Sequence, residues 1–94
     1  MTSQPRIRCE VHYIGQVQGV GFRWNAVNIS RGFPVTGFVG NLPDGRVRLA
    51  VEGEREEVEH FLAAIADSMA GNIRHTQTVA SPATGEFTSF ESAR

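Results

Sequence analysis

The chain contains no lysine, and all nine of its Lys-or-Arg positions are arginine. This absence excludes a lysine Schiff base, and it excludes the P-loop, in which a lysine binds the phosphates of a nucleotide. The arginines are balanced by ten acidic residues, which gives a formal net charge of −1. The sequence therefore lacks the basic excess that is typical of nucleic-acid-binding proteins.

Cysteine and long apolar runs are also scarce. Cys9 is the only cysteine, which excludes a disulfide within the chain. Its alternation with Ile7 and Val11 predicts a small buried side chain rather than a nucleophile. No apolar run approaches the ~20 residues that cross a bilayer, and the polar start MTSQPRIRCE has no signal-peptide core. We therefore expect a cytoplasmic protein with no membrane or nucleic-acid partner.

Metal ligands are few and widely spaced. His12, His60 and His75 show no ligand spacing, and only one cysteine accompanies them. The sequence therefore predicts no metal site. With 94 residues, it predicts one domain over 1–94, with a loose start at 1–5, and a monomer.

Hydrophobic periodicity predicts the elements of the first half. Alternation from Ile7 to Tyr13 predicts a strand with one buried face. Apolar residues at helical spacing predict a helix from Phe22 that ends near residues 32–34, capped by Gly32. Segments 35–41 and 46–53 flank a turn at 42–45 and predict a hairpin.

The second half predicts another helix and two strands. A helix follows Glu54, and its apolar stripe comprises Val58, Phe61, Leu62, Ile65 and Met69. Residues 73–81 predict a less buried strand, and 85–90 predict a short last strand. The whole order predicts an α+β fold, a ferredoxin-like α/β sandwich (βαββαβ plus the short strand) with two helices on one face of a mainly antiparallel sheet. Because that fold serves many functions, the site must identify this one.

The stretch GQVQGVGFRWN, residues 15–25, has three glycines within seven residues and leads to Arg23. It joins the first strand to the first helix, so it presents unpaired backbone N–H groups at a helix N-terminus. These groups and the guanidinium form a candidate site for a carboxylate or phosphate. The glycine spacing fits neither the dinucleotide fingerprint nor the Walker A motif. On composition alone, an anion site and a solvated glycine-rich turn both remain open.

Two motifs resemble the signatures of the acylphosphatase family. GQVQGVGFR resembles the family pattern G-x-V-Q-G-V-x-F-R, and residues 37–47 resemble its second signature, with Gly37, Phe38 and Val39 leading to Asn41. The stretch GEFTSFE, residues 85–91, also resembles the closing strand of the family. The likeness extends over residues 7–91, which is almost the whole chain.

This resemblance implies hydrolysis of the carboxyl–phosphate bond of small acyl phosphates, without a metal or organic cofactor, and with inorganic phosphate as product and inhibitor. It implies catalytic roles for Arg23 and Asn41, with Asn41 orienting the attacking water. The implied phosphate-binding residues are Gln16, Val17, Gln18, Gly19, Val20, Gly21, Phe22 and Arg23. The leaving carboxylate belongs to an acid with a pKa of ~4, so it departs unprotonated and needs no general acid.

The chain departs from the family pattern at several positions. Gly40 stands where a polar or basic residue is usual, so we expect Gly40→Arg to keep or raise the rate. Ser92 replaces a β-branched apolar residue, which predicts a frayed sheet edge. A non-catalytic anion-binding regulatory module of the same fold is the alternative function. RNA binding is a further rival because residues 31–38 resemble the RRM motif, although Pro34 would break the strand that carries it.

Overall fold

The computed structural model describes residues 5–93. The chain order is β1 (Arg6–Gly15), α1 (Phe22–Ser30), β2 (Thr36–Asn41), β3 (Val47–Glu54), α2 (Arg55–Ser68), β4 (Ile73–Pro82) and β5 (Phe90–Ser92). Residues 1–4 of the expected loose start lie outside the described part. No helix within residues 5–93 is long and apolar enough to cross a membrane.

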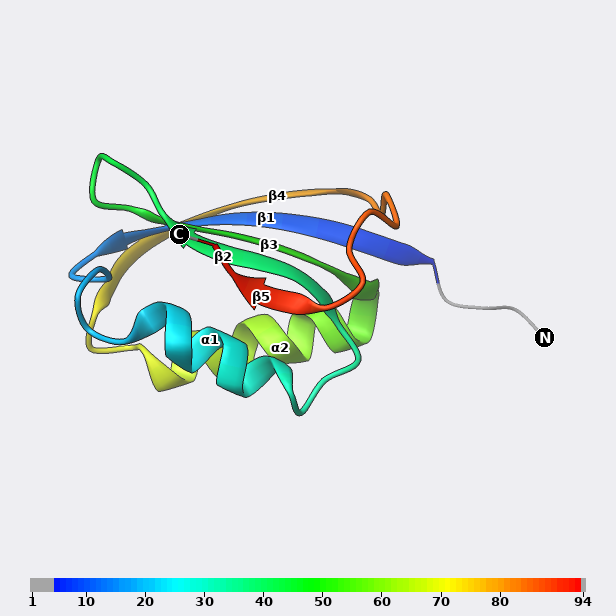
Figure 1. Ribbon diagram of the computed structural model, residues 1–94, viewed down its shortest axis with the longest axis horizontal. Coiled ribbons are helices and arrows are strands. Elements are labelled where there is room, and N and C mark those ends of the chain that lie inside the picture. Colours follow the sequence, from blue (N-terminus) through cyan, green and yellow to red (C-terminus); the bar gives the residue numbers. More distant parts are fainter. Residues whose placement is uncertain (1–4, 94) are drawn as a thin grey trace.

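The five strands form one sheet in the order β4-β1-β3-β2-β5. The β1–β3, β1–β4 and β2–β3 pairs are antiparallel, and only the β2–β5 pair is parallel. Both helices lie on the same face of the sheet (Figure 1). The arrangement confirms the predicted ferredoxin-like α+β sandwich.

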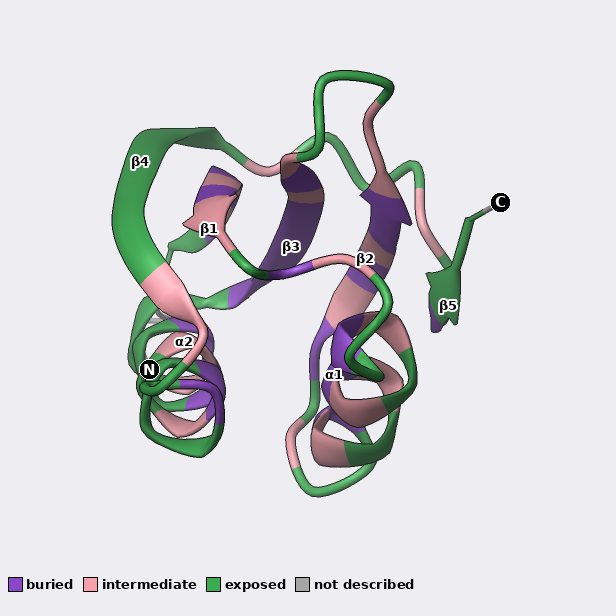
Figure 2. Ribbon diagram, turned by 90° about the vertical axis from the view of Figure 1, so that its left-hand side faces the viewer, coloured by how far each residue is buried: buried purple, intermediate pink, exposed green. Residues whose placement is uncertain are grey.

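The core lies between the sheet and the two helices, as the buried bands of Figure 2 show. The alternation of β1 is confirmed, because Ile7, Cys9, Val11 and Tyr13 are all buried. On α2, Phe61 is fully buried and contacts Phe90 edge-on, with ring centroids 5.1 Å apart. Burial of these apolar side chains stabilises the two-layer structure.

Helix α1 ends earlier than expected and without the predicted glycine cap. After Ser30, the N–H groups of Arg31, Gly32 and Phe33 donate to carbonyls three residues back, at 3.0–3.3 Å. Gly32 does not adopt the left-handed conformation of a glycine cap. A tight 3₁₀-like turn therefore satisfies the final carbonyls of the helix.

The prediction of the last strand at 85–90 is also wrong, because β5 spans Phe90–Ser92. The preceding segment is held by Glu52 of β3, whose carboxylate accepts hydrogen bonds from the N–H groups of Thr84 and Gly85 at 3.0 and 2.9 Å. Phe87 lies against Phe38, with ring centroids 5.8 Å apart. Ser92 of β5 pairs with Val39 of β2, so the sheet edge that was predicted to fray at Ser92 is paired in this structure.

Candidate active site

The loop between β1 and α1 curls tightly at two glycines. Gly19 and Gly21 have φ values of 73° and 79°, a left-handed backbone conformation that residues other than glycine rarely adopt. Gly21 is the N-cap of α1, and no side chain caps the helix there. The curl therefore leaves main-chain groups, with no capping side chain, at the start of the helix.

The backbone N–H groups of this curl donate to no acceptor within the described part of the chain. Within residues 5–93, no backbone carbonyl accepts a hydrogen bond from the N–H groups of residues 17–24, and the first bond of α1 runs from Asn25 N to Gly21 O at 2.9 Å. The first turn also contains no acidic residue. We call these free N–H groups of residues 17–22 the cradle. They present partial positive charge to an anion.

Gln16 differs from the rest of the predicted phosphate-binding set. Its N–H donates to the carbonyl oxygen of Asn72 at 3.0 Å, so this amide is already paired. Gln18 keeps a free N–H but uses its side chain elsewhere, because Nε2 donates to the carbonyls of Leu42 and Arg46 at 2.8 and 2.9 Å. These two bonds fix the loop to the β2–β3 turn.

Two of the hydrophobic side chains of the loop are buried in the core, and one is exposed. The side chain of Val17 is 1% exposed and joins the core, as does that of Phe22. Phe22 packs against Tyr13, with ring centroids 4.8 Å apart. Val20 is exposed. Val17 and Phe22 therefore hold the two ends of the curl against the sheet.

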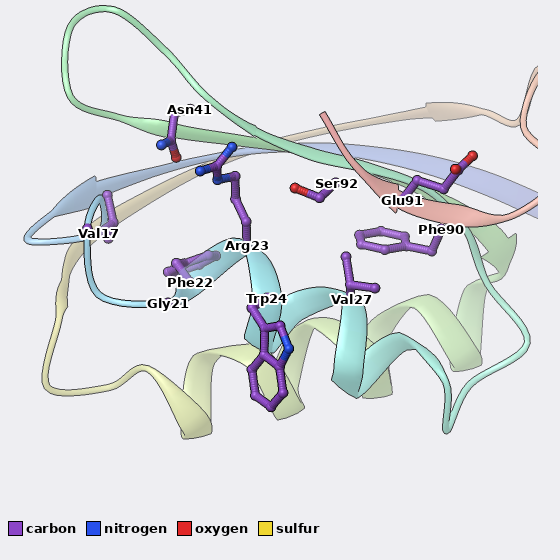
Figure 3. A pocket seen from close by; sticks show the side chains of 11 residues that line it. Val17, Gly21, Phe22, Arg23, Trp24, Val27, Asn41, Phe90, Glu91 and Ser92 are labelled. Atoms are coloured by element: carbon purple, nitrogen blue, oxygen red, sulfur yellow. The ribbon is translucent and has the colours of Figure 1, made fainter. Parts of the chain in front are cut away.

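Arg23 and Asn41 enter the same space from opposite layers. Arg23 lies in the first turn of α1, and its Nη1 donates to the carbonyl oxygen of Ala93 at 3.1 Å. Asn41 ends β2, and both side chains extend toward one another across the pocket in Figure 3. In the described part of the chain, Asn41 Oδ1 is the only buried side-chain nitrogen or oxygen without a hydrogen-bond partner. Such an atom is costly unless a ligand or water satisfies it.

One pocket of about 580 Å³ is lined by Arg23, Asn41 and four residues of the cradle, which are Val17, Gly19, Gly21 and Phe22. Its lining includes Gly19, Gly21, Arg23 and Asn41, so the structure brings the two predicted catalytic residues together with the cradle. The lining also comprises five residues that were not among the predicted site residues, namely Trp24, Val27, Phe90, Glu91 and Ser92. Val27 lies one helical turn after Arg23, so spacing could have identified it. The β5 residues gave no such signal, since their place depends on parallel pairing with β2.

Cys9 and His60 do not line the pocket. Cys9 is buried, and burial raises the pKa of its thiol, which disfavours the nucleophilic thiolate. His60 is exposed on α2. Across residues 5–93, no group of three or more His, Cys, Asp or Glu side chains is placed to hold a metal ion. Trp24 also lines the pocket and is 72% exposed.

The chain is similar in sequence to known proteins over most of its length. The family model "Acylphosphatase" matches residues 9–92. A curated acylphosphatase of Lactobacillus johnsonii is 40% identical over 78 residues, covering 81% of this chain and 86% of the relative. One from Mycobacterium sp. (strain JLS) is 42% identical over 65 residues, covering 69% of each chain.

Solved structures support the same fold. The crystal structure of an acylphosphatase from Bacillus subtilis superposes with a TM-score of 0.84 at 22% identity, covering 94% of this chain and 99% of the other. The family model covers both signature regions, including the loop with Arg23 and the strand end with Asn41. This chain therefore belongs to the acylphosphatase family.

Proposed function

We propose that this enzyme hydrolyses the carboxyl–phosphate bond of acyl phosphates in the Arg23 pocket. The cradle and Arg23 bind the phosphate, and Asn41 orients the attacking water. The observation that carries this proposal is the set of free N–H groups over residues 17–22 beside the guanidinium, facing a buried, unpaired Asn41 Oδ1. Family membership and the curated relatives named acylphosphatase support the reaction class.

The chemistry needs few side chains. Water attacks phosphorus, the bond from phosphorus to the acyl oxygen breaks, and the electron pair leaves with the carboxylate. Asn41 Oδ1 accepts a hydrogen bond from the water, and the proton of the water passes to an oxygen of the phosphate. The cradle and Arg23 stabilise negative charge on the phosphate oxygens during transfer, which is the main requirement of phosphoryl transfer.

Direct assay separates this reaction from the non-catalytic alternative. Benzoyl phosphate absorbs differently from benzoate, so purified protein should produce a spectral change and release inorganic phosphate. We expect competitive inhibition by inorganic phosphate and no effect of EDTA. Phosphate binding without hydrolysis would instead support the anion-binding regulatory module, and loss of activity in EDTA would show that a metal takes part.

The cellular and assembly predictions are part of the same proposal. We propose that the chain acts as a single domain and as a monomer, in the cytoplasm. Light scattering coupled to size-exclusion chromatography tests the monomer, and cell fractionation tests the location. A dimer mass or recovery with another compartment would contradict these two predictions without affecting the proposed reaction.

A further inference from the structure

The side chain of Gln18 connects the loop before α1 to the turn between β2 and β3. Its Nε2 donates to the carbonyl oxygens of Leu42 and Arg46, at 2.8 and 2.9 Å. An amide nitrogen carries two N–H groups, so these bonds use both of them. Gln18 is half-buried and is not among the described residues that line the pocket. Its side chain is therefore bound to the turn, while its backbone N–H stays free in the cradle.

The turn at residues 42–46 also closes on itself. The N–H of Leu42 donates to the carbonyl oxygen of Arg46 at 2.8 Å, and the N–H of Gly45 donates to that of Leu42 at 3.1 Å. With the two bonds from Gln18, the carbonyl oxygens of Leu42 and Arg46 each accept two hydrogen bonds, which uses both of their lone pairs. Gln18 therefore holds a closed turn at both of its ends.

The position of Asn41 depends on this turn. Asn41 ends β2 directly before Leu42, and it pairs with Val47 of β3. Within residues 5–93, no group donates a hydrogen bond to its buried Oδ1. Figure 3 shows its side chain at the end of β2, facing Arg23. The main chain on either side of Asn41 therefore places this oxygen, and the neighbour on one side is Leu42, which Gln18 holds.

The cradle has anchors that do not involve the Gln18 side chain. Val17 and Phe22 are buried in the core at the two ends of the curl. Between them, Gly19 and Gly21 have the left-handed conformation that bends the loop. Removal of the Gln18 amide should therefore leave the N–H groups of the cradle in place and release the turn.

We propose that Gln18 is a positioning residue, whose side chain sets the position of Asn41 relative to a phosphate in the cradle. The inference rests on the proposed function, because it takes the attacking water to be held by Asn41 and the phosphate by the cradle. The water must lie in line with the bond that breaks, so a small displacement of Asn41 slows hydrolysis even when phosphate is bound. Gln18 therefore acts on the rate of transfer rather than on the affinity for phosphate.

Gln18→Met removes the two donors and keeps a side chain of similar length. We expect kcat for benzoyl phosphate to fall about tenfold, and the inhibition constant for inorganic phosphate to change less than about twofold. Gln77→Met, the same substitution at an exposed glutamine of β4, is the control and should keep both values. If the inhibition constant rose as much as kcat fell, Gln18 would hold the cradle or its ligand, and the inference would be wrong.

A double-mutant cycle shows whether Gln18 acts through Asn41. In Asn41→Ala no amide remains to be positioned, so adding Gln18→Met should lower kcat by less than about twofold. An equal fall in both backgrounds would mean that Gln18 acts independently of Asn41, which would overturn the inference while the proposed reaction stands. If the wild-type protein does not hydrolyse benzoyl phosphate, the proposed function fails, and the inference fails with it.

Amide resonances test the same inference without turnover and report whether the variant is folded. In Gln18→Met, the backbone amides of residues 42–46 and the side-chain amide of Asn41 should shift from their wild-type positions. Inorganic phosphate should still shift the amides of residues 17–22 with the wild-type midpoint. Unmoved signals of the turn and of Asn41 would overturn the inference. Gln18→Asn, whose amide is one carbon shorter, serves in the same assays if the methionine variant does not fold.

Discussion

The guanidinium of Arg23 donates from Nη1 to the carbonyl oxygen of Ala93 at 3.1 Å, which joins the first turn of α1 to the segment that follows β5. Ala93 is itself held in place, because its N–H donates to Val39 O of β2 at 2.7 Å. A guanidinium has five N–H donors, so one bond to Ala93 leaves others for an anion. The segment after β5 therefore positions the cation over the pocket.

Arg23→Gln should impair both binding and turnover. The substitution removes the only cation lining the described pocket, so we expect kcat/KM for benzoyl phosphate to fall about 10³-fold and inhibition by inorganic phosphate to weaken. Steady-state kinetics measure both quantities. The control is Arg31→Gln, at an exposed arginine after the same helix, which should keep wild-type kinetics. Full activity in Arg23→Gln would show that the guanidinium has no such role.

Asn41→Ala should separate turnover from binding. The amide oxygen is proposed to orient water rather than hold phosphate, so we expect kcat to fall about 10²-fold while the inhibition constant for inorganic phosphate changes little. Asn28→Ala, at an exposed position on α1, is the matched control. If phosphate affinity collapsed together with kcat, Asn41 would be a binding or folding residue instead.

Gly40 lies against Ala93, whose carbonyl oxygen accepts the hydrogen bond from Arg23. A Cβ atom built at Gly40 would lie 3.2 Å from the Cβ of Ala93, which is closer than ordinary contact. Gly40→Arg, which was expected to keep or raise the rate, should therefore lower it, because the side chain displaces the residue that holds Arg23.

The smaller substitution Gly40→Ala isolates this effect. We expect kcat/KM to fall by a factor of about ten to a hundred, as for loss of one hydrogen bond to a charged group. Gly71→Ala, at a glycine with open space around it and no positive φ, is the control and should keep the activity. Unchanged or increased kcat/KM in Gly40→Ala would show that Ala93 yields without affecting Arg23.

Glu52 should make stability depend on pH under acidic conditions. Burial raises the pKa of this carboxyl, but hydrogen bonds from Thr84, Gly85 and Arg8 outweigh burial and lower it to about 2, from 4.5. A lowered pKa in the folded state means that the carboxylate stabilises the fold above pH 4.5 and that this contribution disappears as the pH falls toward 2. The full contribution is on the order of 3 kcal/mol.

Denaturant unfolding at several pH values tests the role of Glu52. Glu52→Gln should lower the free energy of unfolding at pH 7 and flatten its decline between pH 4.5 and 2. Glu59→Gln, at an exposed position on α2, should keep the wild-type profile. An equally steep acid decline in Glu52→Gln would assign the pH dependence to other groups.

Periodicity and turn chemistry predicted most of the fold. The alternation of β1 and the stripe of α2 depend on local spacing, and the predicted residues are buried except Leu62, which is half-buried. The prediction of a glycine cap for α1 was wrong because a 3₁₀-like turn satisfies the last carbonyl groups of the helix. The predicted start of β5 was wrong because Glu52 accepts hydrogen bonds from Thr84 and Gly85. This is a long-range contact that the local sequence does not reveal.

The site was predicted in part. The two signatures led to Arg23, Asn41 and the glycine loop, and the structure brings these into one pocket. The pairing of the Gln16 N–H with Asn72, and the position of Ala93 beside Gly40, depend on how distant segments meet. Neither contact follows from composition or spacing. The same holds for Phe90, Glu91 and Ser92 of the lining, because β5 reaches the pocket only through its parallel pairing with β2.

The central claim is that the cradle itself binds phosphate, and nuclear magnetic resonance of ¹⁵N-labelled protein titrated with inorganic phosphate tests it most directly. Saturable shifts of the backbone amides of residues 17–22 and of the Arg23 side chain, with the paired Gln16 amide moving less, are the result that we predict. Saturable shifts located elsewhere, with the amides of residues 17–22 unmoved, would contradict it.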